Sequence, residues 1–402
     1  MKSKQLVFII ISVLITLTAT FALEVEPVGF WDTQSRAYAV DVSGDIACIA
    51  DYQGGLVIVD ISDPERPRGI AQLNIPGFAC GLAISGENVY VSSLEVGIYV
   101  VDLSNPRQPN IIGSIQTQGG ANEVAISGDF AYVAAMAGGL RVINIENPRD
   151  LREVDWVGTR EVAREVYISG EYAYVACNQG GLDVVDISDP ENVRVVGNYD
   201  SPGNGFGITV NGQYAYLADY DAGLKVINVE DPEEPELEAA LNIPQLVWGV
   251  TYAYSHVFVA NHSNDLRVFD ASDPVNLELV SIGQTVDVAI DVVVQDNYVY
   301  VADHEGGLRI FEITGIGLNI APNEIDFERV AVDGRSERDI TVSNHIGEEF
   351  EILRVDVDGE YFSIDFQAPE FIEPNAEIEI PVIFAPEESG NFEGTITVFS
   401  DD

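Results

Sequence analysis

The phrase GGLVIVDISDP at residues 54–64 returns at a fixed interval along most of the chain. The proline that ends it recurs every 42 residues, and the interval never changes. The positions are Pro64, Pro106, Pro148, Pro190, Pro232 and Pro274. A period of this length is typical of propeller blades and of stacked repeat arrays, in which each repeat is one structural unit. The repeat therefore constrains the fold before any residue is given a chemical role.

Each repeat contains four short apolar runs separated by turn residues. In the first repeat these runs cover residues 39–42, 46–50, 56–61 and 69–73. Four such runs, rich in β-branched and aromatic residues, predict a four-stranded antiparallel sheet. The second run is apolar at consecutive positions, as in Val89-Tyr90-Val91, so we expect neighbouring sheets to cover both of its faces.

Turn residues recur at three positions of the repeat. Glycines such as Gly44 close the hairpin between the first and second strands, and glycines such as Gly55 follow the second strand, where Asp265 replaces glycine in the sixth repeat. Both residue types tolerate the left-handed conformation of a tight turn. The Asp or Asn before each proline step, such as Asp60, is expected to accept hydrogen bonds from local backbone, which is a structural role.

The repeats number seven when they are counted by their third strands. The seventh has no fourth strand of its own, but residues 26–31 resemble the fourth strands at 110–115 and 194–199. We therefore expect the N-terminal strand to complete the last sheet. A ring closed in this way leaves no exposed sheet edge. The predicted fold class is all-β, with a seven-bladed β-propeller at residues 23–315.

The phrase at residues 55–64 resembles the signature of the LVIVD-repeat propellers, and the copies at 181–190 and 223–229 keep it. This resemblance covers about residues 26–314. It implies an exported or surface-displayed protein of a bacterial or archaeal type, and it implies no particular ligand.

The period ends near Ile316, and residues 316–402 show alternating runs typical of a small β-sandwich. Segments at 325–327, 341–344, 381–386 and 394–398 resemble immunoglobulin-like domains of the Hydin and abnormal-spindle type, which implies a spacer or a protein-binding module. That family continues into one more strand than this sequence contains, so we expect the sandwich to lack its last strand.

Residues 1–22 have the pattern of a secretory signal peptide, with Lys2 and Lys4 before an apolar run and small residues before a cleavage site after Ala22. An uncleaved N-terminal anchor is the alternative. We expect a secreted or cell-surface location, with no membrane span after cleavage. The three cysteines cannot all pair and are interpreted as buried small hydrophobic residues.

The formal net charge of −47, from 66 acidic and 19 basic residues, is spread along the chain. Because phosphate binding needs basic patches, this charge argues against nucleic acid and anionic membranes as partners. The sequence leaves the oligomeric state open. We expect an extracellular protein or a glycan as the partner.

In a propeller, the loops after the second and fourth strands open on one common face, the loop face. Aligned on the repeat, these loops supply a set of polar and aromatic residues that differ from blade to blade. The candidate ligand-binding residues are Tyr38, Tyr52, Arg164, Phe206, Asp219, Tyr220, Asp221, Trp248, His262, Asp303, His304 and Glu305. Exposed aromatic rings beside charged groups form a reasonable recognition surface, although rings that only fill the crowded centre are the alternative.

Two histidines, His262 and His304, occupy one repeat position in adjacent blades, and Asp303 precedes the second. Imidazole and carboxylate groups bind divalent cations, but no short motif fixes their geometry here. We therefore expect no resident cofactor or metal and keep a divalent cation as a weaker hypothesis. Asp219 and Asp303 also suggest a general acid and base, although carboxylates are so common that this pairing says little.

No motif of a known hydrolase, phosphate-binding loop or redox centre occurs in the sequence. The sequence therefore predicts a non-enzymatic binding or scaffold protein, with the propeller as a rigid disc and the sandwich as a spacer. The alternative is an extracellular enzyme, a metal-assisted hydrolase or lyase, with its site on the same loop face.

Overall fold

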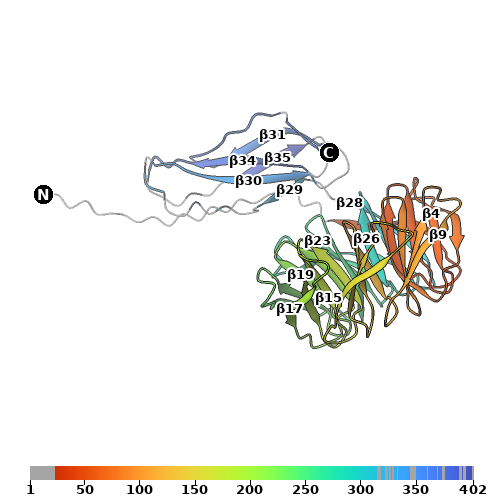
Figure 1. The fold of residues 1–402 in the computed structure, drawn as a ribbon. Helices are drawn as coiled ribbons and strands as arrows, with labels where there is room; N and C mark the ends of the chain where they lie inside the picture. Colours follow the sequence, from red (N-terminus) through yellow and green to blue (C-terminus); the bar gives the residue numbers. More distant parts are fainter. Residues whose placement is uncertain are drawn as a thin grey trace. The chain divides into compact units, whose positions relative to one another are not determined.

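The computed structural model arranges the repeats as seven four-stranded antiparallel sheets, the blades of a propeller (Figure 1). The structure describes residues 23–314 without a gap. From the C-terminal part it describes residues 318–321, 325, 327, 330–332, 334–344, 350–359, 361–368, 370–373, 376–388, 392 and 395–400. The predicted signal peptide at residues 1–22 lies outside the described residues.

The first three blades follow the chain in order from the axis outward. Blade 1 consists of β2 (Ala39–Ser43), β3 (Ile46–Ala50), β4 (Leu56–Asp60) and β5 (Arg68–Leu73). Blade 2 consists of β6 (Ala79–Ser85), β7 (Asn88–Ser93), β8 (Gly97–Asp102) and β9 (Asn110–Gln116). Blade 3 consists of β10 (Glu123–Ser127), β11 (Phe130–Ala134), β12 (Leu140–Asn144) and β13 (Arg152–Val157).

The next three blades repeat this order. Blade 4 consists of β14 (Glu165–Ser169), β15 (Tyr172–Ala176), β16 (Leu182–Asp186) and β17 (Arg194–Tyr199). Blade 5 consists of β18 (Gly207–Asn211), β19 (Tyr214–Ala218), β20 (Leu224–Asn228) and β21 (Glu236–Leu241). Blade 6 consists of β22 (Val247–Ala253), β23 (His256–Asn261), β24 (Asp265–Asp270) and β25 (Glu278–Gln284).

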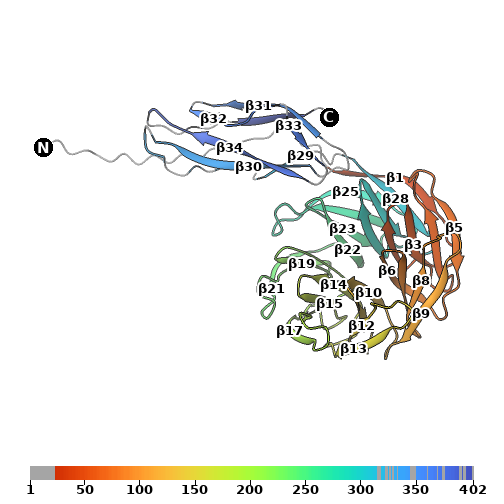
Figure 2. The same ribbon diagram turned by 45° about the horizontal axis from the view of Figure 1, so that its top comes forward.

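Blade 7 closes the ring with strands from both ends of the propeller sequence. It consists of β26 (Asp291–Gln295), β27 (Tyr298–Ala302), β28 (Leu308–Thr314) and β1 (Glu24–Trp31). Strand β1 pairs with β28 from Glu24–Thr314 to Trp31–Leu308. The innermost strand of each blade packs against those of its two neighbours, and β26 packs against β2. In Figure 2 the outer strands β5, β9, β13, β17 and β21 lie at the rim. The predicted seven blades and N-terminal closing strand are confirmed.

The core lies between the blades. One apolar cluster, for example, joins Cys48 and Leu56 of blade 1 to Val91 and Tyr99 of blade 2. The middle strands are buried on both faces, as the burial of four consecutive residues in β4 shows. Each fully buried Val, Leu or Ile side chain contributes roughly 1.5–3 kcal/mol, so the blades stabilise one another. Cys48, Cys80 and Cys177 are free and buried, as predicted.

The turns follow the predicted chemistry, with one correction. The hairpin glycines, such as Gly44 (φ 55°), and the second-turn glycines, such as Gly55 (φ 79°), have positive φ. In blade 6 the predicted left-handed residue, Asp265, is instead the first residue of β24, and Asn264 (φ 62°) takes the positive φ. The prediction was wrong because β23 extends to Asn261 and shifts the turn.

The residues from Gly315 onward belong to a second compact unit with two antiparallel sheets. One sheet contains β29 (Leu318–Ala321), β30 (Ser336–Asn344), β34 (Glu377–Phe384) and β32 (Phe362–Ile364). The other contains β33 (Glu370–Ile372), β31 (Phe350–Asp358) and β35 (Thr395–Ser400). Residues of both sheets, including Val342, Ile352, Val382 and Ile396, form one core.

Candidate functional site

The loop face is built by hydrogen bonds between neighbouring blades. The carbonyl of Tyr52 in blade 1 accepts a hydrogen bond from Ala79 N in blade 2, at 3.0 Å. The same bond joins Met136 to Ala163 and Tyr220 to Val247, each at 3.0 Å. This shows that the loop after the second strand of one blade lies beside the loop that enters the next blade. The two predicted kinds of loop therefore share one face.

A left-handed residue stands at the same turn position in five blades. The five residues are Tyr52 (φ 45°), Met136 (φ 52°), Asn178 (φ 42°), Tyr220 (φ 40°) and His304 (φ 38°). Asn is the residue among them that tolerates this conformation best. The backbone is the same in all five, so the turn does not dictate which side chain it carries.

One group of rings spans blades 7, 1 and 2, and we name it the Tyr38 cluster: Tyr38, Tyr52, Phe78 and His304. Tyr52 is stacked between Phe78, with ring centroids 4.5 Å apart, and Tyr38, at 5.2 Å. The His304 ring meets Tyr38 edge-on at 5.9 Å. His304 Nδ1 also lies 2.9 Å from Asp287 Oδ2, which fixes the imidazole against its own blade. All four rings are partly exposed.

A second group spans blades 4, 5 and 6, and we name it the Arg164 cluster: Arg164, Phe206, Tyr220 and Trp248. The Arg164 guanidinium lies over the Phe206 ring, 4.9 Å from its centroid. Tyr220 stacks against Phe206 at 4.7 Å, and Trp248 meets Phe206 edge-on at 4.8 Å. Burial lowers the pKa of the Arg164 guanidinium. The structure thus brings these four candidate residues together.

Two other candidate residues lie beneath the loop face. Asp219 and Asp303 have no exposed surface. Asp219 Oδ2 accepts a hydrogen bond from Gly203 N (3.2 Å) and forms an ion pair with Lys225 Nζ (3.4 Å). Asp303 accepts bonds from Val286 N (2.9 Å) and Asp287 N (3.0 Å) and pairs with Arg309 Nε at 3.2 Å.

These buried carboxylates hold the loops that join the blades. Burial raises the pKa of both Asp219 and Asp303, while backbone donors and the paired cations lower it in part. Asp51 has the same position in blade 1 and binds Ser35 N at 3.1 Å. In blade 4 the carboxylate comes from the next strand: Asp183 accepts a bond from Arg160 N at 2.8 Å, and Cys177 fills the usual position. Their role in this structure is to anchor loops.

Four further carboxylates lie on the innermost strands. Asp291 Oδ2 accepts a hydrogen bond from Val40 N of the next blade (3.0 Å), and Asp41 Oδ2 accepts one from Ile84 N (2.7 Å). Burial, together with repulsion by Asp291, raises the pKa of Glu123 and Glu165 well above the usual range, and Glu165 also contributes repulsion at Glu123. Burial raises the pKa of Asp291 to about 6. These groups satisfy backbone N–H groups at the inner sheet edges.

The other three candidate residues are exposed and are not members of the two ring clusters. Asp221 and His262 are exposed, and exposed Glu305 lies 3.7 Å from Arg36. Across the part of the chain that the structure describes, no group of three or more His, Cys, Asp or Glu residues is arranged to hold a metal ion. The geometry therefore gives His262, His304 and Asp303 no common centre.

Sequence reasoning missed Phe78 and Asp287, which contact the candidate residues Tyr52 and His304. Both lie in loops between blades, but not at the repeat position that was compared between blades. Lys225 and Arg309, the partners of the buried carboxylates, were also missed. The signal was present, since Lys225 is one of three lysines and stands at the same repeat position as Arg309.

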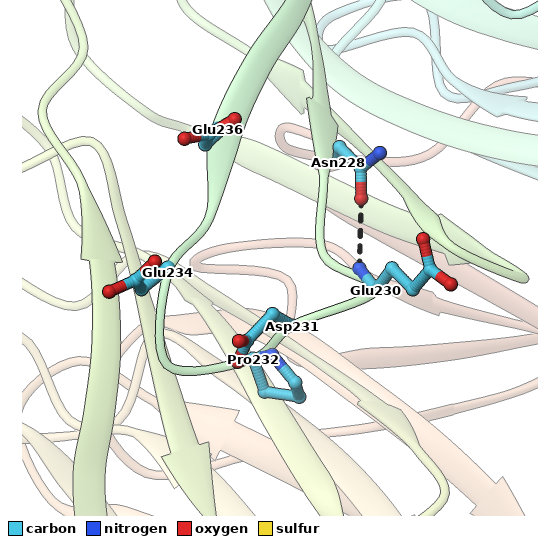
Figure 3. A pocket seen from close by; sticks show the side chains of 6 residues that line it. All are labelled: Asn228, Glu230, Asp231, Pro232, Glu234 and Glu236. Atoms are coloured by element: carbon cyan, nitrogen blue, oxygen red, sulfur yellow. Dashed lines mark hydrogen bonds between the residues drawn. The ribbon is translucent and has the colours of Figure 1, made fainter.

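The opposite face, the turn face, carries the Asp-Pro steps. Figure 3 shows a hollow there in blade 5, lined by Asn228, Glu230, Asp231, Pro232, Glu234 and Glu236. Asn228 Oδ1 accepts a hydrogen bond from Glu230 N at 3.0 Å, and Asp231 Oδ1 accepts one from Glu233 N at 3.0 Å. These side chains close the turn, as predicted for the residues before each proline. The hollow is therefore a product of turn structure.

Comparison with protein families identifies the repeat. The family model described as "LVIVD repeat" matches residues 35–70, 76–117, 118–159, 162–201, 202–242, 252–285 and 288–314. The model described as "Transmembrane protein 131-like N-terminal" matches residues 318–400. The Hydin-type resemblance of this region stays a prediction. No curated protein matches the sequence. No helix in the described residues is long and apolar enough to cross a membrane.

Solved structures similar to this chain are β-propellers of low sequence identity. The WD40 repeats of RRP9 share 14% identity, with a TM-score of 0.58, 76% of this chain covered and 99% of that one. The β-propeller domain of Cps50 (Swd1) from Myceliophteria thermophila shares 12% identity, with a TM-score of 0.58 and coverages of 72% and 100%. A computationally designed protein, Ika8, shares 13% identity, with a TM-score of 0.54 and coverages of 72% and 99%. At these identities the likeness establishes the fold alone.

Proposed function

Because the chain belongs to the LVIVD-repeat family of β-propellers, we propose that it is an exported or cell-surface binding protein whose loop face holds a protein or glycan ligand. The observation that carries this proposal is the pair of ring clusters on that face. One combines stacked, partly exposed rings with an imidazole and the other with a guanidinium, and such surfaces suit recognition because aromatic rings offer large apolar faces beside polar groups.

The backbone conformation of the tyrosines supports a role beyond packing. Tyr52 and Tyr220 have positive φ, which costs a residue of this kind roughly 1–2 kcal/mol relative to the right-handed region. Asn178 at the same position of blade 4 shows that the fold accepts a residue better suited to this turn. Residues with a strained backbone that persist where a better-suited residue fits are often found at ligand sites.

Export is supported by the pattern at residues 1–22, and the C-terminal unit is proposed as a spacer or interaction module. We favour binding over the alternative hydrolase or lyase because Asp219 and Asp303, the carboxylates suggested as acid and base, are fully buried beneath the loops. A general acid or base must come within hydrogen-bonding distance of its substrate, and these two groups already bind loop backbone.

The ligand is tested by presenting the full chain to glycan and protein arrays. Variants Tyr52→Asn and Trp248→Ala remove one ring from each cluster, and Trp156→Asn is the matched control. Trp156 is an exposed ring on outer strand β13, and Asn198 has its position in blade 4. We expect one or both loop-face variants to lose the array signal and the control to keep it. A signal that survives both loop-face changes contradicts the proposal.

Export has a separate test. We expect the protein recovered from the outside of expressing cells to begin at Leu23, as read by N-terminal sequencing. Recovery of the chain only from the cell interior, with Met1 or Lys2 at its start, contradicts export.

A further inference from the structure

Arg164 differs from the other cations on the loop side of the propeller, because no carboxylate among the described residues forms an ion pair with it. Lys225 pairs with Asp219, Arg309 with Asp303 and Asp32, and Arg36 with Glu305. The Arg164 guanidinium instead lies between the Phe206 ring and Met136 Sδ, which is 4.0 Å from its Nη1. In a chain with 66 acidic residues, this unpaired cation is conspicuous.

Two nitrogen donors of the Arg164 cluster are buried and have no acceptor in the described chain. They are Arg164 Nε and Trp248 Nε1. A buried donor without a partner destabilises the folded state, so native structures usually supply water or a ligand at such positions. Both donors belong to residues that contact Phe206, and both atoms are covered, so an acceptor beside that ring reaches them only if the side chains of the cluster shift on binding.

The surroundings limit the charge of such a group. A guanidinium held flat by a ring presents its planar N–H edge, which matches the two oxygens of a carboxylate. The net charge of −47 repels polyanions at long range, so one carboxylate on an otherwise neutral body fits better than a highly charged polymer. The neighbouring rings, Tyr220 and Trp248, supply polar tips and apolar faces for that body.

We propose that the Arg164 cluster is a subsite for an acidic sugar, with the sugar carboxylate on the Arg164 guanidinium and the pyranose ring against Trp248 and Tyr220. This inference rests on the proposed binding function and names the chemistry of one of its two ring clusters. A sugar is favoured over a peptide carboxylate because the apolar face of a pyranose ring can lie against the exposed parts of Trp248 and Tyr220 while its carboxylate pairs with Arg164.

The test uses the full chain and a trisaccharide that ends in glucuronic acid. The same trisaccharide as its methyl ester, and one that ends in glucose, are the ligand controls. Because the chain has three tryptophans, Trp31→Phe and Trp156→Phe leave Trp248 as the single reporter of binding by fluorescence. We expect the acid to bind at least tenfold more tightly than the ester or the neutral sugar, and added salt to weaken the preference.

Arg164→Gln is expected to abolish the preference for the acid, and Arg107→Gln, which removes an exposed arginine from the turn face, to leave it unchanged. Equal binding of the acid and the ester by the wild-type chain overturns the inference without use of any variant. The inference is also overturned if the array ligand depends on Trp248 or Tyr52 but contains no acidic sugar. That result supports the proposed binding function. A peptide that binds through its free C-terminal carboxylate, with the same need for Arg164 and in the absence of sugar binding, also overturns the inference. Failure of the whole array overturns the proposed function itself.

Discussion

The two faces of the propeller use aspartate in opposite ways. On the turn face, Asp60 and Asp186 are only partly buried, and each Oδ1 accepts hydrogen bonds from the serine two residues later. These bonds lower the pKa of both carboxyls. On the loop face, Asp51, Asp219 and Asp303 are fully buried, and burial raises their pKa.

This difference explains why one face is uniform and the other varies. A carboxylate that accepts a hydrogen bond from backbone two residues later needs no residue outside its own turn. The same residue can therefore recur at this position in every blade. A buried carboxylate that holds a loop between blades depends on its neighbours, so blade 5 adds Lys225, blade 7 adds Arg309 and blade 4 moves the carboxylate to Asp183. Variation between blades therefore marks both the anchors of the loop face and the residues that they position.

The largest expected effect comes from breaking a loop-face anchor. Lys225→Met leaves Asp219 buried without its cation, and we expect a loss of about 3–5 kcal/mol in the free energy of unfolding. The control is Arg152→Met, which breaks an exposed pair with Asp150 and should cost less than about 1 kcal/mol. Chemical denaturation of the full chain measures both. Similar losses in the two variants would show that burial does not separate the two classes of carboxylate.

The turn face is tested by its contact with the neighbouring blade. A Cβ at Gly113 would meet the carbonyl oxygen of Pro148 at 2.1 Å, so the proline step of blade 3 packs against the outer strand of blade 2. We expect Gly113→Val to lower the free energy of unfolding by about 2–3 kcal/mol, because the added side chain clashes with backbone atoms. Gly158→Ala, where the nearest atom lies at 4.0 Å, is the control and should be nearly neutral in the same denaturation measurement.

The pH dependence of stability should have opposite signs at the two kinds of carboxylate. The folded-state pKa of Asp291, beside the loop face, is raised from 3.8 to about 6. The folded state therefore holds its proton more tightly, and the stabilisation is complete below about pH 4 and is lost as the pH rises through about 6. Relative to Asp291→Asn, the wild-type chain should lose about 2–3 kcal/mol between pH 4 and pH 7.

Asp60→Asn is the matched change on the turn face. Because the folded-state pKa of Asp60 is lowered, its contribution is present above the unfolded pKa and is lost as the pH falls through the folded pKa. The stability of each variant relative to the wild type, followed by thermal melting from pH 3 to pH 7, should change in opposite directions. Parallel curves would show that burial of a carboxylate does not decide the sign of its pH dependence.

The smallest expected effect on stability is at a candidate ligand residue. Tyr220→Asn removes ring contacts with Phe206 and Trp248 but places at this turn the residue that blade 4 uses. The lost ring contacts and the relieved backbone strain have opposite effects on stability. We expect the free energy of unfolding to change by no more than about 1 kcal/mol. A loss of 3 kcal/mol or more in chemical denaturation would show that the Arg164 cluster is mainly a packing element.

The repeat spacing was sufficient to predict the propeller, because each blade solves the same problem with the same turn residues. The blade count, the closing strand (predicted at residues 26–31 and observed at Glu24–Trp31) and the turn role of Asp60 followed from it. Asp265 shows the limit: the repeat position predicted its conformation, but one additional strand residue in blade 6 moved the turn to Asn264.

The site was harder to predict, because a repeat position names a loop and not the direction of a side chain. Asp219 and Tyr220 are adjacent in one loop. Asp219 is buried and forms an ion pair with Lys225, whereas Tyr220 is partly exposed and stacks against Phe206. Phe78 was missed because it has no aromatic counterpart at its repeat position in the neighbouring blades. Partners contributed by a different blade cannot be read from a single repeat.

The pairing of β1 with β28 also sets the order in which the molecule can be finished. The first strand of the propeller, β1, has no partner until the last propeller strand, β28, has been synthesised, since Glu24 pairs with Thr314 across nearly the whole propeller sequence. Until β28 forms, β1 has no partner strand in blade 7 and its edge is open, a hazard for pairing with other chains. During synthesis the ring therefore stays open until the seventh repeat has emerged. The pairing of β1 with β28 forms last, and folding of the propeller is incomplete without it.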